Sequence, residues 1–306
     1  KKLETRCQSL PGPERTQPGK AYPVIEVDDG EGTMSHTKLT LAISTLTSRL
    51  DAALTVFDKL TPCDSVEMLI LVQGGASEEE NGTDSGTVRI EYLDTLGLSH
   101  SRNAALEISK GDFVWFLDDD VAIDNQDLNW LLRQLGNDSA VHIGQIKCSD
   151  CDNLYKDYSR NREGKVGALR TSSIEIIAPR QKIQDAGIKF NTQIGLGTAF
   201  PSGEENLFLL DALASGLIFQ HLNRPIISHP CLLEERKPGN SWKNQALVRS
   251  KGIIARHVGG ITGITLAIWW GARASYYNRS PIGMLWVLSS LVPGQSNANG
   301  IRDNKR

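Results

Sequence analysis

A short apolar run that ends in three carboxylates places the strongest constraint on the fold of this chain. Residues 113–117 read FVWFL and are followed at once by Asp118, Asp119 and Asp120. Such a short run of bulky residues is typical of a strand buried on both faces of a parallel sheet. Ligands of open α/β sheets bind beyond the carboxyl ends of the strands. The three acids therefore predict a hard oxygen site for Mg²⁺ or Mn²⁺, where the ion would hold a phosphate.

Strand and helix patterns alternate on both sides of this run. Strands are predicted at 39–46, 67–72, 88–92, 113–117, 140–146 and 173–178, with one or two more over 217–227, and helices at 48–60, 99–109, 127–135 and 204–215. This alternation implies right-handed βαβ units, so we predict an α/β fold with a mainly parallel sheet flanked by helices. Helical patterns at 243–257 and 261–277, with a shorter apolar segment at 282–291, predict a C-terminal extension.

Composition bounds the domain organisation and the class of function. We interpret residues 1–33, which are polar and rich in Pro and Gly, as a flexible leader or tag, 34–237 as the α/β domain, 238–294 as the helical extension and 295–306 as a disordered tail. A net charge of −3 gives no reason to expect nucleic-acid binding. Five scattered cysteines argue against a disulfide framework and favour a reducing compartment. No apolar run reaches the roughly 18 residues of a spanning helix, so we expect a cytoplasmic protein.

Two motifs resemble the signatures of family 2 glycosyltransferases of the GT-A fold. Residues 97–121 read GLSHSRNAALEISKGDFVWFLDDDV, which is similar to the central signature of that family. Residues 200–216 read FPSGEENLFLLDALASG, which is similar to the acidic segment that carries the catalytic base. The resemblance implies a GT-A fold and an inverting, metal-dependent transfer of a sugar from a nucleotide sugar to an acceptor hydroxyl.

The resemblance also implies roles for the acids that follow the predicted fourth strand. Asp120 would coordinate the metal, Asp118 would bond the ribose or share the metal, and Asp119 is the least constrained. Adjacent carboxylates repel each other, which makes a bound cation attractive. The alternative is a solvated turn that leads into a helix, a position to which Asp124 and Asp127 are suited.

Arg102 and Asn103 match residues that face the nucleotide in the family. Arg102 can clamp a diphosphate with two hydrogen bonds, and a helix N-terminus favours anions. The alternative is a capped helix with an exposed arginine. His229, which precedes Pro230, is a candidate for a further metal ligand, although a lone histidine is more often a hydrogen-bonded structural residue.

Glu204 and Glu205 are the candidates for the general base. Glu205 matches the Asp position of the family's acidic pair, and Glu204 is the second choice. An inverting transferase needs one carboxylate to take the proton from the acceptor hydroxyl. The alternative is structural, because Ser202 and Glu205 have the spacing of a capping box.

The ends of the first two strands depart from the family pattern. The turn at 44–49 reads STLTSR where members carry a Thr-Tyr-Asn type turn, and we retain Thr45 and Arg49 as donor-binding candidates. Gln73 replaces the acid that meets a uracil or thymine ring, and its amide can still bond a base edge. The resemblance therefore implies a UDP- or dTDP-sugar as donor and leaves the identity of the base open.

The acceptor and the partners are less constrained than the donor. A saccharide or a lipid-linked acceptor fits the family. The Trp-, Tyr- and Arg-rich C-terminal helices favour packing on the catalytic domain or closing a homo-oligomer, and peripheral contact with the inner face of a membrane is the alternative. Other hypotheses for the whole chain are a retaining relative, a nucleotidyltransferase, which usually needs a Gly-rich phosphate loop, and a non-catalytic domain that binds a nucleotide sugar or a glycan.

Overall fold

The computed structural model describes residues 36–75, 87–136, 140–151, 153–159, 163–230 and 239–291, all within a unit that runs from Ser35 to Arg306. The predicted leader at 1–33 and the predicted tail at 295–306 lie outside the described residues, as do residues 76–86 between β2 and β3. The boundary between residues 237 and 238 stays a prediction.

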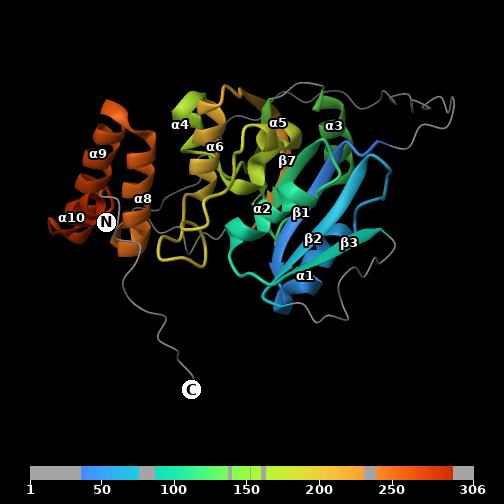
Figure 1. Cartoon of the computed structure of the whole chain (residues 1–306), viewed down its shortest axis with the longest axis horizontal. Coiled ribbons are helices and arrows are strands. Elements are labelled where there is room, and N and C mark those ends of the chain that lie inside the picture. Colours follow the sequence, from blue (N-terminus) through green and yellow to red (C-terminus); the bar gives the residue numbers. More distant parts are fainter. Residues whose placement is uncertain are drawn as a thin grey trace, which may run out of the picture. The chain divides into compact units, whose positions relative to one another are not determined.

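Among the described residues, seven strands form one sheet in the order β3-β2-β1-β4-β6-β5-β7 (Figure 1). They are β1 (Leu39–Leu46), β2 (Val66–Gln73), β3 (Val88–Leu93), β4 (Phe113–Leu117), β5 (Val141–Cys148), β6 (Ile176–Pro179) and β7 (Phe219–His229). β1 pairs in parallel with β2 and β4, β2 with β3, and β5 with β7, whereas β6 is antiparallel to both of its neighbours. The predicted α/β fold with a mainly parallel sheet is confirmed.

Helices cover both faces of the sheet, which explains the apolar strands. The helices are α1 (Leu50–Phe57), α2 (Leu98–Ile108), α3 (Asn125–Gln134), α4 (Gly164–Ala168), α5 (Arg180–Asp185), α6 (Glu204–Ala214), α7 (Asn240–Lys243), α8 (Gln245–Val258), α9 (Gly260–Asn278) and α10 (Ile282–Ser289). One core cluster joins α1 and α3 to strand residues such as Ile43 and Trp115. The other joins α2, α5 and α6 to Ala42 and Phe116. Successive side chains of one strand thus enter opposite cores.

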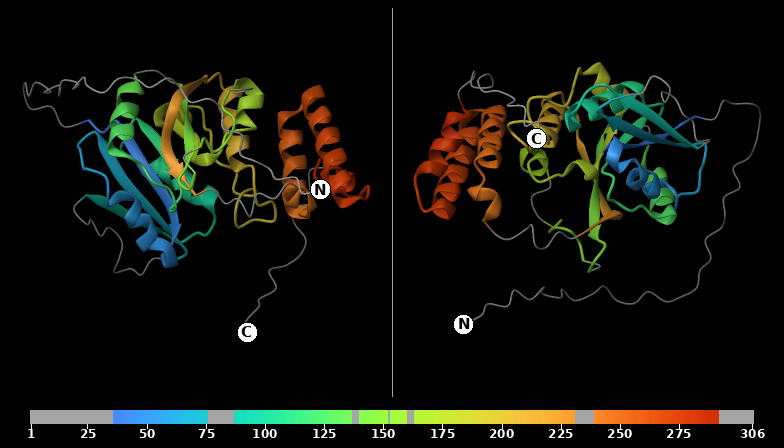
Figure 2. Two further views of the ribbon diagram at one scale, coloured as in Figure 1. Left: turned by 180° about the vertical axis from the view of Figure 1, so that it is seen from behind. Right: turned by 90° about the horizontal axis from the view of Figure 1, so that it is seen from below.

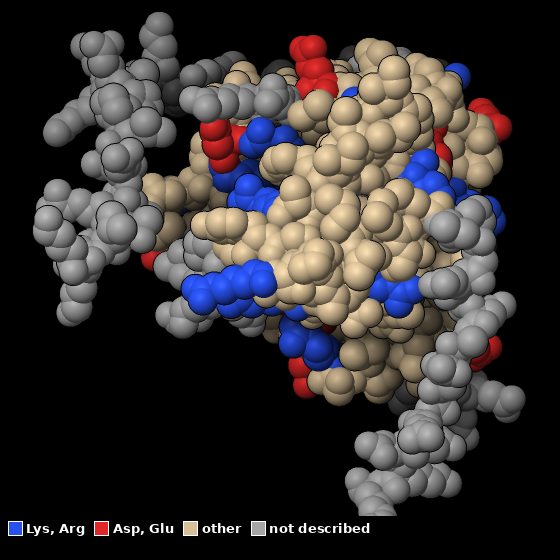
Figure 3. Space-filling model, turned by 90° about the vertical axis from the view of Figure 1, so that its left-hand side faces the viewer, with Lys and Arg blue, Asp and Glu red and all other residues tan. Residues whose placement is uncertain are grey.

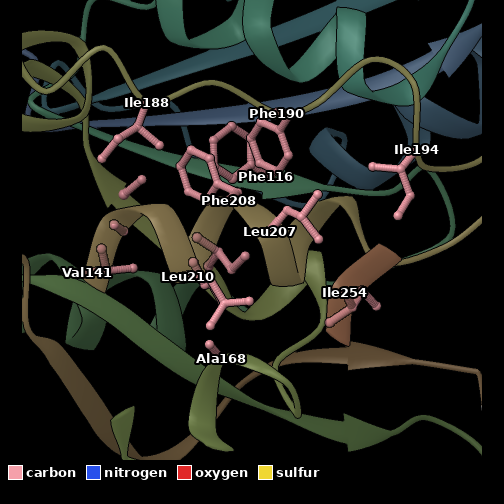
Figure 4. Close-up of a cluster of buried hydrophobic side chains, with 14 of the residues drawn as sticks. Phe116, Val141, Ala168, Ile188, Phe190, Ile194, Leu207, Phe208, Leu210 and Ile254 are labelled. Carbon is pink, nitrogen blue, oxygen red and sulfur yellow. The ribbon is translucent and has the colours of Figure 1, made fainter. Parts of the chain in front are cut away.

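Aromatic rings form the centre of the second core (Figure 4). Phe190 and Phe208 stack with their centroids 4.2 Å apart, and the edge of Phe116 faces Phe190 at 5.0 Å. Ile254 of α8 belongs to the same cluster. The C-terminal helices are therefore joined to the sheet and its helices through a shared core.

Helices α8, α9 and α10 pack closely on one another (Figures 1 and 2). A Cβ atom on Gly263 of α9 would clash with the carbonyl oxygen of Ala255, and one on Gly283 of α10 would clash with the backbone of Ala274 and Ser275. These glycines allow the helix backbones to approach. None of the described helices combines the length and the apolar character that crossing a bilayer requires.

The structure differs from the sequence prediction at several element ends. Residues 173–175 form a 3₁₀ helix with a capping box between Ser172 and Glu175, so β6 begins at Ile176. The short helices α4 and α5 were not predicted. The capping box that we weighed as the alternative role of Ser202 and Glu205 does not form: the N-cap of α6 is Gly203, which has a left-handed backbone conformation, and no side chain caps the helix. Cys148 is disulfide-bonded, which the odd, scattered set of cysteines did not predict.

Candidate active site

A pocket of about 610 Å³ lies at the carboxyl ends of β1, β2 and β4. The sheet register pairs Leu46 with Gln73, and Ile43 with Leu117, so the three strands end along one edge. The polar side chains that line the pocket are Ser44, Thr45, Arg49, Gln73, Asp118, Asp119 and Asp120. Six of the residues proposed from sequence are thereby brought to one cavity, at the edge of the sheet where ligands of such folds bind.

Asp119 is held by two residues from the turn after β1. Arg49 donates from Nε and Nη2 to the two carboxylate oxygens, at 2.8 and 2.5 Å, and Thr45 Oγ1 donates to Oδ2 at 2.6 Å. Two parallel hydrogen bonds of this kind fix the orientation of the guanidinium relative to the carboxylate. Asp119 raises the pKa of Arg49 through its hydrogen bonds and its charge. The least constrained acid of the sequence prediction is thus the one that ties β1 to β4.

Gln73 and several apolar residues form another wall of the pocket. Gln73 Oε1 accepts a hydrogen bond of 2.8 Å from the backbone N–H of Gly97, which leaves its NH₂ group for another acceptor. Leu96 is 67% exposed and Leu196 is 66% exposed, although both line the cavity. Sequence reasoning missed these two leucines, and the one signal was the placement of Leu196 between Gly195 and Gly197.

Arg102 lies inside the protein and does not line the pocket. Its guanidinium is 3% exposed and pairs with Glu204 Oε1 at 2.8 Å and with Asp118 Oδ1 at 3.5 Å. It also lies 5.6 Å from the centroid of the Phe190 ring. Arg102 therefore connects the acids that follow β4 to the first turn of α6.

The side chain of Asn103, the other nucleotide-binding candidate on α2, is hydrogen-bonded to the backbone of Phe190. Its Nδ2 donates to the Phe190 carbonyl at 2.9 Å, and its Oδ1 accepts from the Phe190 N–H at 2.8 Å. This reciprocal pair anchors α2 to the chain segment that leads toward α6. The structure does not bring Asn103 to the pocket.

Glu205 is the acid of the pair whose proton affinity is perturbed most clearly. Burial and the neighbouring charge of Glu204 raise the pKa of Glu205 to about 8. Glu204 is already paired with Arg102, whereas the structure records no ion pair for Glu205 among the described residues. A carboxyl group with a pKa near neutrality is suited to proton transfer in catalysis.

Asp120 faces His229, which arrives from the far end of the sheet. A β-bridge pairs Ala122 with Ser228, and it brings the end of β7 beside the acidic cluster. Asp120 Oδ1 and His229 Nε2 are 3.4 Å apart. The hydrogen bond between them lowers the pKa of Asp120 and raises the pKa of His229.

The donor set of Asp120 and His229 fits a divalent cation. His229 Nδ1 lies 2.8 Å from the carbonyl oxygen of Pro230, to which it donates. In the neutral imidazole this leaves the lone pair on Nε2, the atom that faces Asp120, as in many metal-binding histidines. Within the described ranges, no three His, Cys, Asp or Glu side chains are grouped to hold an ion by themselves. Mg²⁺ commonly takes only one or two protein carboxylates together with substrate phosphates.

Comparison with protein families decides the class of protein. The model of glycosyl transferase family 2 matches residues 77–201, a range that includes the SRN segment and the three acids after β4. Over this range the chain is similar to family 2 glycosyltransferases, and we identify the protein as a glycosyltransferase. The candidate base Glu205 lies just beyond the matched range of this glycosyltransferase.

Solved structures of TarS from S. aureus share the fold of the glycosyltransferase. The structure of TarS 1-349 in complex with UDP-GlcNAc has a TM-score of 0.52 and 15% identity, over 83% of this chain and 91% of that one. The complex of TarS 1-349 with UDP has a TM-score of 0.51 and 14% identity, over 83% of this chain and 89% of that one. A longer TarS structure has a TM-score of 0.51 and 15% identity, over 83% of this chain and 55% of that one. At these identities the likeness concerns the GT-A fold alone. A comparison with curated protein sequences finds no significant match.

Proposed function

We propose that the glycosyltransferase moves a sugar from a nucleoside diphosphate sugar to an acceptor hydroxyl, with inversion at the anomeric carbon. The observation that carries this proposal is the convergence of Thr45, Gln73 and the three acids after β4 on one pocket of about 610 Å³. A cavity of this volume accommodates a ligand of the size of a nucleotide sugar. The crystallised complexes of the similarly folded TarS with UDP and UDP-GlcNAc support a uridine donor.

Each wall of the pocket has a part in the proposed binding of the donor. Gln73 offers its NH₂ group to a carbonyl of the base, and the exposed side chains of Leu96 and Leu196 supply apolar surface. Asp118 offers its carboxylate to the ribose hydroxyls. Arg49 and Thr45 fix Asp119, so that the turn after β1 is held in place when the donor enters.

Asp120 and His229 would hold a divalent cation, with Asp118 beside them. When bound, Mg²⁺ or Mn²⁺ neutralises the diphosphate leaving group. Glu205 takes the proton from the acceptor hydroxyl, because it is the acid of the pair that Arg102 does not occupy. Arg102 is a positioning residue in this proposal: its ion pair holds Glu204 beside Glu205, and the charge of Glu204 helps to raise the pKa of that base.

A thermal-shift series tests the donor class. The protein is titrated with UDP, UDP-GlcNAc, dTDP and GDP, each with and without Mn²⁺, and a ligand at 100 times its Kd adds about 2.7 kcal/mol of stability. We expect stabilisation by a uridine or thymidine diphosphate that is larger with Mn²⁺. Stabilisation by none of these ligands would overturn the proposal.

A product assay separates the remaining hypotheses. Incubation with a nucleotide sugar and an acceptor panel should release a nucleoside diphosphate. Release of pyrophosphate would identify a nucleotidyltransferase. Tight donor binding with neither transfer nor hydrolysis across the panel would identify a non-catalytic binding domain.

A further inference from the structure

The two last described helices carry an apolar surface that none of the described residues buries, which we call the outer face. Its members are Ile261, Ile264, Ile268, Trp269 and Tyr276 of α9 and Ile282, Leu285 and Leu288 of α10. Their exposed fractions run from 40% at Ile282 to 82% at Ile261. Scattered exposed apolar residues are normal on soluble proteins, but a contiguous group of large ones marks an interaction surface.

The helical spacing shows that the outer face is a separate stripe and not the edge of the core. Ile261, Ile264 and Ile268 recur every three or four positions along α9, so they lie on one side of the helix. The opposite side of α9 holds Gly263, Ala267 and Ala274, which are buried against α8 and α10. α9 therefore has two apolar sides, and within the described part of the chain one of them is packed while the other is exposed.

The charges within the C-terminal helices all have one sign. Residues 239–291 contain six Lys and Arg residues and no Asp or Glu. They are Lys243, Arg249, Lys251, Arg256, Arg273 and Arg279. Figure 3, which faces the end of the molecule where α9 and α10 lie, shows an uncharged centre with Lys and Arg around it and some Asp and Glu at the outer edge of the view. Basic residues around an apolar, Trp- and Tyr-containing surface are typical of proteins that lie on anionic membranes.

A pocket beside the outer face adds a place for a charged group. Lys243, Tyr276, Tyr277, Asn278 and Arg279 line a cavity of about 810 Å³. Tyr276 belongs both to this cavity and to the outer face. The two cations and the polar groups of the tyrosines and the asparagine are suited to a phosphate headgroup.

We propose that the outer face docks the glycosyltransferase on an anionic lipid bilayer, with a lipid phosphate in the cavity of Lys243 and Arg279. The apolar stripe enters the boundary between headgroups and acyl chains, and the basic margin meets the lipid charges. A second copy of the chain is disfavoured as the occupant, because the positive charges of two sets of C-terminal helices would repel each other. The contact is peripheral, since no described helix is suited to span a bilayer.

Vesicle co-sedimentation of the full chain tests this proposal independently of sugar transfer. We expect the protein to bind vesicles of phosphatidylcholine mixed with phosphatidylglycerol at least about tenfold more tightly than vesicles of phosphatidylcholine alone. High salt should release it, because surface charges are then screened. The variant I264S/I268S should bind the anionic vesicles about tenfold more weakly. K243Q/R279Q should lose most of the preference for the anionic lipid.

The matched control is V166S/I218S, which replaces two apolar residues that are 50% and 69% exposed and belong neither to the pocket nor to the outer face. It should bind vesicles as the unaltered protein does. Equal vesicle binding by I264S/I268S would overturn the proposal, and so would the absence of binding to anionic vesicles. Self-association without lipid that disappears in I264S/I268S would show instead that the outer face joins two copies of the chain.

Discussion

At the scale of single residues, the acids that follow β4 have separate environments despite being adjacent. Asp118 faces Arg102, Asp119 is clamped by Arg49, and Asp120 faces His229. A cation partner favours the charged form of a carboxylate, which reduces the repulsion among the three. Asp120 pairs with the imidazole of His229, a group that can itself bind a metal, so we expect the loss of Asp120 to affect cation binding more than it affects folding.

Asp120→Asn should lower sugar transfer by about 10²–10³-fold, because the ligand charge that faces the leaving group is removed. The stabilisation by Mn²⁺ in the presence of a nucleoside diphosphate should be lost as well. The control is Asp124→Asn, since Asp124 caps α3 by accepting from the N–H of Gln126, and asparagine caps equally well. Unchanged transfer by Asp120→Asn would remove Asp120 from the site.

Glu205→Gln should lower transfer by about 10²–10⁴-fold, the usual contribution of a general base. In the unaltered protein the base is active only when ionised, so kcat/KM should rise about tenfold per pH unit up to a pKa of about 8 and level off above it. Glu204→Gln should retain a pH-dependent rate. A pH profile that stays flat below pH 8 would count against Glu205 as the base.

The same raised pKa predicts how stability depends on pH. The folded pKa of Glu205, about 8, lies above its ordinary value of 4.5, so ionisation opposes folding. The stabilisation of the folded state by protonated Glu205 is fully present below pH 4.5, and it is lost as the pH rises toward about 8. Urea unfolding across this range should show the decline in the unaltered protein and a smaller decline in Glu205→Gln.

At the scale of elements, Arg102 joins three parts of the chain through buried charges. It lies on α2 and pairs with Asp118 after β4 and with Glu204 at the start of α6. The sequence identified all three residues as candidates, because each lies in a motif. It did not show that they contact each other, since the contact joins residues 102 positions apart in the chain.

Arg102→Ala should lower the free energy of unfolding by about 3–5 kcal/mol, because it leaves a buried carboxylate without its partner. Lys189→Ala is the control: Lys189 pairs with Glu107 at 2.9 Å, but both side chains are more than half exposed. That pair should contribute about 0–1 kcal/mol. Urea denaturation of both variants measures the difference, and similar losses would contradict a buried role for Arg102.

The start of α6 depends on a glycine. Gly203 has φ of 105°, and a Cβ atom there would lie 2.5 Å from Cδ1 of Ile254 on α8. Gly203→Ala should therefore cost about 3 kcal/mol, from backbone strain together with overpacking. Gly187→Ala, at φ of 65° with no atom nearby, should show the strain alone, about 1 kcal/mol. Adding Ile254→Val to Gly203→Ala should recover part of the loss in thermal unfolding, and no recovery would contradict the proposed clash.

At the scale of the whole molecule, local patterns predicted the sheet more reliably than they predicted the contacts across it. Strands β1 and β4 begin and end as predicted, because both are apolar runs with clear boundaries. The short helices α4 and α5 carry too few residues for a periodic pattern. The approach of His229 to Asp120 depends on a bridge between Ala122 and Ser228, and no local pattern records such a pairing.

The C-terminal helices show the same limit. Their helical periodicity was predicted, and the structure has them at Gln245–Val258, Gly260–Asn278 and Ile282–Ser289. The sequence left open whether their aromatic residues pack or face outward. The structure divides them: Trp270 is 8% exposed, whereas its neighbour Trp269 is 54% exposed. Adjacent residues on a helix point about 100° apart, so Trp270 packs inward while Trp269 faces outward.

Because residues 239–291 contain no acidic residue, charge is distributed unevenly along the chain. The rest of the chain carries 27 of the 33 Lys and Arg residues against all 36 Asp and Glu residues, so the overall pI of about 6.1 describes neither part. At neutral pH such a protein should be retained on sulfonate resins as well as on quaternary amine resins, because a resin meets whichever patch matches it. Retention on both kinds of resin would reveal this uneven charge distribution before any lipid is added. K243Q/R279Q should elute earlier from the sulfonate resin alone.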